Sequence, residues 1–173
     1  MHNPSNPIHV EFLIRLFSEF NSQNIDYCLS RNYQSLPNEI SDDIDILVRE
    51  SQVPNVDSII RELAVAPLFL VKQLKRNYHL QYYISSVDEI AKAIDENRAA
   101  EIVELDIVTA LQWRGIPNLD TKSVLSARRS FNDFFVPDAA LLRFSLRPSA
   151  LALRHLLRTG DHGSRPRGVG LGR

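Results

Sequence analysis

The stretch Ser41-Asp42-Asp43-Ile44-Asp45-Ile46-Leu47-Val48 marks the point where a polar loop turns into an apolar β-strand. Asp43 and Asp45 are two residues apart, so in an extended chain both side chains lie on the same face, about 7 Å apart along the strand. Two anions on one face repel each other, and one pKa rises unless a cation lies between them. The pattern therefore predicts a strand that holds a cation at its polar end.

The segments around this stretch predict an alternation of helices and strands. Apolar residues at helical spacing predict helices over residues 8–22, 87–98 and after Pro54, and Asp120 is predicted to cap a short helix through Arg129. The Ser86-Val87-Asp88-Glu89 pattern is typical of a helix capping box. Strands are predicted over residues 25–29, 44–48, 68–74, 78–84 and 101–111, with a turn at Lys75-Arg76-Asn77.

A third carboxylate lies in the predicted strand Val103-Glu104-Leu105-Asp106-Ile107-Val108. If this strand neighbours residues 44–48, a spacing of about 4.8 Å brings Asp106 beside Asp43 and Asp45. Three carboxylates with no nearby His or Cys favour Mg²⁺ or Mn²⁺ over zinc or copper, and the five histidines show no paired ligand spacing. The alternative is that these acids lie on a solvated strand edge.

Divalent ions at such a site suit phosphoryl-type chemistry. One ion lowers the pKa of an acceptor hydroxyl, and another neutralises charge on a triphosphate and its leaving group. Transfer of this kind needs mostly positioning and charge neutralisation, which metals and basic side chains supply.

Several short motifs, taken in order, resemble a known family. Asp43-Ile44-Asp45 before an apolar strand, with a later Asp106, resembles the nucleotidyltransferase superfamily typified by DNA polymerase beta. More narrowly, roughly residues 8–137 resemble an uncharacterised bacterial nucleotidyltransferase-like family whose members are often associated with surface polysaccharide gene clusters. The motifs that carry this resemblance are Tyr27-Cys28-Leu29-Ser30-Arg31-Asn32-Tyr33, Leu36-Pro37, Ser41-Asp42-Asp43-Ile44-Asp45, Leu105-Asp106 and Trp113-Arg114-Gly115.

The resemblance implies an α/β (or α+β) fold of the minimal nucleotidyltransferase type, with a mixed sheet flanked by helices. It implies that Asp43 and Asp45 hold Mg²⁺ (or Mn²⁺), and that Asp106 completes the catalytic metal site and helps to activate the acceptor hydroxyl. The implied activity is transfer of a nucleotidyl group from an NTP to a hydroxyl acceptor, with surface polysaccharide biosynthesis as the implied pathway. The alternative is a catalytically silent binding or scaffold module with the same fold.

One departure from the superfamily concerns the triphosphate cradle. Most active members have a Gly-Ser pair after the first strand, whereas this chain has Ser30, Arg31 and Asn32 at that place. These three residues are the predicted nucleotide-binding residues, with Arg31 in bidentate contact with a phosphate. Arg31 could equally pair with Asp43 or Asp45 and leave a site without nucleotide.

Two further groups each allow two interpretations. Lys72, Lys75 and Arg76 could hold a phosphate or an acceptor, or form a solvated turn. Trp113-Arg114-Gly115 could line the substrate, or combine a core tryptophan with an exposed arginine.

The composition suits one domain of a soluble protein: 173 residues, of which 44% are hydrophobic. A single cysteine, Cys28, cannot form an internal disulfide and is predicted to be a small core residue. The N-terminus lacks the features of a signal peptide, and the longest apolar stretch, around residues 65–71, is too short to span a bilayer. These observations predict a cytoplasmic protein without a membrane span.

The charge is divided unevenly along the chain. Residues 1–138 carry 13 basic and 20 acidic residues, whereas residues 139–173 carry seven arginines and one acid, Asp161. We therefore predict a nucleotidyltransferase-like domain over residues 1–137, a helical extension over 138–158 and a disordered basic tail over 159–173. The tail could instead be a non-native end. A nucleic-acid partner through its arginines is a third hypothesis, which the lack of interleaved aromatic residues disfavours.

Overall fold

The structure is a computed structural model that describes residues 6–40, 43–76, 79–113 and 116–138. Its helices are α1 (Pro7–Ser22), the short 3-10 helix η1 (Glu50–Gln52), α2 (Val53–Leu63), α3 (Val87–Asp95) and α4 (Thr121–Ser126). Its strands are β1 (Tyr27–Leu29), β2 (Ile44–Val48), β3 (Leu68–Arg76), β4 (His79–Ser86), β5 (Val103–Val108), β6 (Leu111–Trp113), β7 (Ile116–Leu119), β8 (Arg129–Phe131) and β9 (Phe134–Val136).

Five of these strands form one mixed sheet in the order β1-β2-β5-β4-β3. β2 and β5 run parallel, and the other neighbouring pairs run antiparallel. The fold is therefore α+β, with a mixed sheet and helices beside it, which confirms the predicted fold class. The hairpins β6–β7 and β8–β9 were not predicted.

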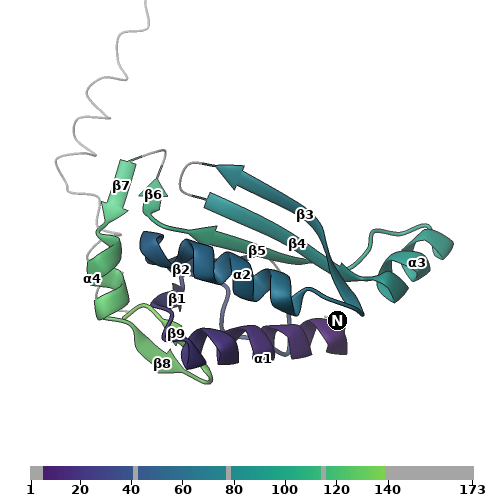
Figure 1. Cartoon of the computed structure of the whole chain (residues 1–173), viewed down its shortest axis with the longest axis horizontal. Coiled ribbons are helices and arrows are strands. Elements are labelled where there is room, and N and C mark those ends of the chain that lie inside the picture. Colours follow the sequence, from purple (N-terminus) through teal and green to yellow (C-terminus); the bar gives the residue numbers. More distant parts are fainter. Residues whose placement is uncertain (1–5, 41–42, 77–78, 114–115, 139–173) are drawn as a thin grey trace, which may run out of the picture.

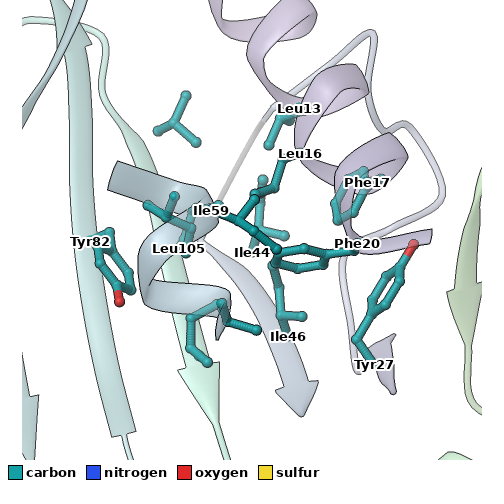
Figure 2. Packing of buried hydrophobic residues seen from close by; sticks show 14 of the residues in the cluster. Leu13, Leu16, Phe17, Phe20, Tyr27, Ile44, Ile46, Ile59, Tyr82 and Leu105 are labelled. Carbon is teal, nitrogen blue, oxygen red and sulfur yellow. The ribbon is translucent and has the colours of Figure 1, made fainter. Parts of the chain in front are cut away.

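Helices α1 and α2 cover one face of the sheet and bury the main core (Figure 1). Ile44 and Ile46 of β2 point toward these helices, where they pack with Leu16 and Phe20 of α1 (Figure 2). Period-two alternation sends the residues between them to the opposite face. On that face a smaller apolar cluster joins Cys28, Leu47, Val124 and Leu125 beneath α4.

Cys28 is fully buried in this smaller cluster, as predicted for a core residue. Burial raises the pKa of its thiol to about 12, so the thiol stays protonated at neutral pH. Cys28 is therefore a packing residue and not a nucleophile.

Local capping signals explain where the helices begin. The side chains of Asn6, Ser86 and Asp120 accept backbone N–H bonds at the starts of α1, α3 and α4. Pro54 lies in the first turn of α2, where its missing N–H costs no helical hydrogen bond.

Several predicted boundaries were wrong. The helix predicted over residues 87–98 ends at Asp95, and the strand predicted over residues 101–111 is divided into β5 and β6. Lys75 and Arg76 belong to β3 and not to a turn, because the antiparallel pairing with β4 continues through Arg76 and His79. The helix after Asp120 ends at Ser126, and Arg129 begins β8.

The described part of the chain contains no helix long and apolar enough to cross a membrane. The predicted extension lies outside the described residues from 139 onward, as does the whole predicted tail, so both stay predictions. The predicted motif Trp113-Arg114-Gly115 also includes residues outside the described ranges.

Candidate metal centre

The register between β2 and β5 brings the predicted acidic residues together. Asp45 of β2 is the direct partner of Asp106 of β5 in the parallel pairing. Asp43 immediately precedes β2 and lies two residues before Asp45, so in an extended chain both side chains point to the same face. Because Ile44, Ile46, Leu105 and Ile107 fill the core face, the acids between them lie on the opposite face of the sheet.

The three carboxylates converge at this face. Asp43, Asp45 and Asp106 each offer an oxygen, and these oxygens lie within 4.8 Å of one another. Their side chains are 20%, 13% and 9% exposed, so solvent screens their mutual repulsion only partly. A compact set of carboxylate oxygens fits a hard divalent cation such as Mg²⁺ or Mn²⁺. The expected convergence of these residues is confirmed, whereas binding of a metal stays a prediction.

Arg31 reaches this cluster from the loop after β1. Its Nη2 atom lies 2.5 Å from Asp43 Oδ2, and its Nε donates a hydrogen bond to Asp45 Oδ2. The sequence allowed Arg31 either to contact a phosphate or to pair with the aspartates. In the structure Arg31 pairs with both aspartates. The guanidinium lies mostly in solvent, since the side chain is 57% exposed.

The neighbours of Arg31 fix this loop to β2. The Ser30 N–H donates to the Asp45 carbonyl oxygen over 3.0 Å, which extends the pairing of β1 with β2 by one residue. Asn32 has a φ of 55°, a left-handed conformation that asparagine tolerates better than most residues. That Ser30, Arg31 and Asn32 contact a nucleotide stays a prediction.

Strand β4 supplies polar partners to Asp106 that the sequence reasoning missed. His79 Nε2 lies 3.0 Å from Asp106 Oδ2, and Gln81 Nε2 donates to Asp106 Oδ1 over 2.9 Å. Gln81 also reaches Glu104 Oε1 at 3.4 Å, and the Tyr83 hydroxyl donates to the same oxygen over 2.9 Å. These contacts fix the orientation of both acids of β5.

Sequence alternation carried a signal for this polar row. Glu104 and Asp106 repeat the two-residue spacing of Asp43 and Asp45, which marks the same face of β5. In the segment His79-Leu80-Gln81-Tyr82-Tyr83, every second residue has a hydrogen-bonding group on that face. What the sequence did not reveal is that β4 lies directly beside β5.

The predicted basic group of Lys72 and Lys75 does not form one patch. Lys72 pairs with Tyr83 on the acidic face, and its Nζ lies 5.9 Å from the centre of the Tyr83 ring. Lys75 pairs with Leu80, which belongs to the core face. Lys75 lines a cleft of about 620 Å³ beside α2, together with Asp57, Arg61, Gln73 and His79.

Asp57 closes a hydrogen-bond network at that cleft. Burial alone would raise the pKa of Asp57, but hydrogen bonds from Tyr82, Arg61 and Gln73 outweigh it and lower the pKa. The carboxylate accepts from the Tyr82 hydroxyl over 2.6 Å and from Gln73 Nε2 over 3.0 Å. Side chains from α2, β3 and β4 thus satisfy the Asp57 carboxylate within the fold.

Two solved structures from Helicobacter pylori align with the chain. JHP933 is 11% identical and covers 95% of this chain and 62% of its own length, with a TM-score of 0.47. A structure described as a "putative nucleotidyltransferase" is 10% identical and covers 78% of this chain and 54% of its own, with a TM-score of 0.44. The chain thus spans less than two thirds of either protein. At these values the neighbours bear on neither the activity nor the substrate of this chain.

A scan of protein-family models finds no match to the chain. A search of curated proteins finds no match either.

Proposed function

We propose that the chain is a metal-dependent nucleotidyltransferase that moves a nucleotidyl group from an NTP to a hydroxyl acceptor. The observation that supports this most is the convergence of Asp43, Asp45 and Asp106 from two parallel neighbouring strands. Bound Mg²⁺ or Mn²⁺ would neutralise charge on the triphosphate and lower the pKa of the attacking hydroxyl. The residues of this chain would hold the ions, orient the reactants and accept a proton.

We assign the metal-holding role to Asp43 and Asp45 and a double role to Asp106. In the proposed reaction the acceptor oxygen bonds to the α-phosphorus, the bond from that phosphorus to the β-phosphate oxygen breaks, and pyrophosphate leaves. The hydroxyl proton passes to a carboxylate, for which Asp106 is the candidate. The contacts of Asp106 with His79 and Gln81 support this role, because they hold its carboxylate in one orientation.

The finer parts of the proposal rest on the sequence resemblance. Ser30, Arg31 and Asn32 would contact the phosphates of the NTP, and Arg31 would have to turn from the aspartates to do so. The first acceptors to screen are hydroxyl groups of surface-polysaccharide precursors. We further propose that residues 1–137 form the catalytic domain.

One observation favours a second candidate function. Arg31 pairs with both Asp43 and Asp45, so an internal cation already balances part of the charge that would hold a metal. A binding or scaffold module without catalysis would retain such a pair permanently. The two candidates differ in whether Mg-ATP or Mg-CTP binds in a metal-dependent way.

The test combines calorimetry with substitutions. Mn²⁺, Mg-ATP and Mg-CTP are titrated into the wild-type chain, Asp45→Asn, Asp106→Asn and the control Asp95→Asn, an exposed acid at the end of α3. Turnover is followed as pyrophosphate release with candidate acceptors. We expect Asp45→Asn and Asp106→Asn to lose metal binding and turnover with the fold intact by circular dichroism, whereas Asp95→Asn matches the wild type.

Wild-type turnover in both Asp45→Asn and Asp106→Asn would refute the catalytic assignment. A wild-type chain that binds neither Mn²⁺ nor either nucleotide would favour the silent module instead.

A further inference from the structure

We infer that Arg31 is an internal cation that occupies the carboxylate cluster until a divalent ion displaces it, so that Arg31 sets the metal affinity of the site. The inference rests on the proposed function, because it concerns the same three aspartates. It adds a role for Arg31 that is separate from contact with a phosphate.

The cluster holds more carboxylates than Arg31 can pair with. Three carboxylates lie within 4.8 Å of one another, and Arg31 contributes one positive charge through its bonds to Asp43 and Asp45. Asp106 is held instead by Gln81 and by His79. Among these described groups three carboxylates face one guanidinium, and a divalent ion at the same place would supply twice the positive charge of Arg31.

Arg31 is more accessible to solvent than the aspartates it contacts. The Arg31 side chain is 57% exposed, whereas those of Asp43 and Asp45 are 20% and 13% exposed. The guanidinium thus covers the aspartates from the solvent side and can leave without opening the core. Ion pairs of an exposed arginine are weak, because water solvates the released group well.

Arg31 and a divalent ion would use the same carboxylates. Arg31 donates to Oδ2 of both aspartates, which lie on the same face at the start of β2. A divalent ion held by the same carboxylates would lie within a few ångströms of the guanidinium and would repel it. Arg31 and the ion therefore compete for one site.

The experiment measures Mn²⁺ affinity by calorimetry in the full chain, at fixed salt and pH. The variants are Arg31→Gln, Arg31→Lys and the matched control Arg49→Gln. Arg49 is also a half-exposed arginine, 49% exposed, and it pairs with Asp26 over 2.6 Å away from the cluster. Asp26 keeps a second partner in this control, because Arg128 lies 3.0 Å from it.

We expect Arg31→Gln to bind Mn²⁺ roughly tenfold more tightly than the wild type, the factor that two partly exposed ion pairs together supply. The Mn²⁺ affinity of Arg31→Lys should lie between those of the wild type and Arg31→Gln, since an ammonium lacks the planar fork that spans two carboxylates. Arg49→Gln should match the wild type. A second readout is the rise in melting temperature on adding Mn²⁺, which should be larger in Arg31→Gln.

Equal or weaker Mn²⁺ affinity in Arg31→Gln, with clear binding in the wild type, overturns the inference and leaves the proposed function standing. Absence of Mn²⁺ binding in both chains counts against the proposed function and the inference together. Binding in Arg31→Gln alone supports the inference, because it identifies Arg31 as the group that excludes the ion.

Discussion

In the described part of the chain, two arginines each bridge two carboxylates, and their surroundings differ. Arg31 joins Asp43 to Asp45 on the face of the sheet opposite α1 and α2. Arg98 follows α3 and joins Glu89 to Glu96, with its Nη1 atom 2.6 Å from Glu89 and its Nε 2.6 Å from Glu96.

The Arg98 bridge satisfies its buried acid completely within the fold. Glu89 is 6% exposed, and its carboxylate accepts from two Arg98 nitrogens and from the backbone N–H of Glu101 over 2.8 Å. These bonds, from Arg98 first and then from Glu101, lower the pKa of Glu89 to about 2. They connect α3 to the segment that enters β5, so the bridge has a structural role.

The Arg31 bridge lies beside more carboxylates than it contacts. A third carboxylate, that of Asp106, lies within 4.8 Å, and the arginine itself is mostly exposed. An arginine that spans two carboxylates is therefore not diagnostic of either role. An excess of carboxylates beneath an exposed cation distinguishes the candidate site from the structural bridge.

The largest effect on stability is expected at the structural bridge. Arg98→Ala leaves Glu89 charged and nearly buried with a single backbone donor, which is costly. We expect the melting temperature to fall by roughly 5–10 °C, measured by differential scanning calorimetry at pH 7. Mn²⁺ should not restore it, because among the described residues Arg98 contacts the carboxylates of Glu89 and Glu96 and no third one.

Arg49→Ala is the control for the Arg98 substitution, because Arg49 pairs with the more exposed Asp26. Its melting temperature should stay within roughly 2 °C of the wild type. Equal losses in both variants would remove the distinction between a buried and an exposed bridge.

A smaller effect on the melting temperature is expected when Glu89 loses its charge. Because the pKa of Glu89 lies below its ordinary value, its ionised form stabilises the fold fully above about pH 4.5 and less as the pH falls toward 2. Glu89→Gln should therefore melt roughly 3–5 °C below the wild type at pH 7, and the gap should narrow between pH 4.5 and 2.5. A gap that stays constant over this range would show that the charge of Glu89 is not what stabilises α3.

The fold was predictable where the pattern of apolar residues is regular. The helical spacing that begins at Phe12 gave α1, and the run from Ile44 gave β2, because each fills one face of the core. The capping pattern at Ser86 predicted the start of α3. The partners of the Glu89 carboxylate are Arg98 and the backbone N–H of Glu101, which lie beyond the helix, and the spacing of residues within a helix does not predict such contacts.

The acidic cluster was predictable from the alternation of side chains along the strands, whereas the residues that contact the cluster were not. Alternation put Asp43, Asp45 and Asp106 on outward positions, and only one assumption, that β2 neighbours β5, was needed to join them. The pairing of Arg31 depends on the conformation of the loop after β1, which no periodicity fixes. The contacts of His79 and Gln81 depend on β4 lying beside β5, which is a matter of topology.

The smallest effect is expected at Asp43, and it tests the comparison most directly. Asp43→Asn removes one ion pair with Arg31 and also removes the repulsion of Asp43 by Asp45 and Asp106. These changes have opposite signs and similar size, so without metal the melting temperature should stay within roughly 2 °C of the wild type. In Mn²⁺ the wild type should gain stability and Asp43→Asn should gain less, because one ligand is missing. A large loss at Asp43 without metal would make the Arg31 bridge structural, like that of Arg98, and the contrast between the two arginines would no longer identify a metal centre.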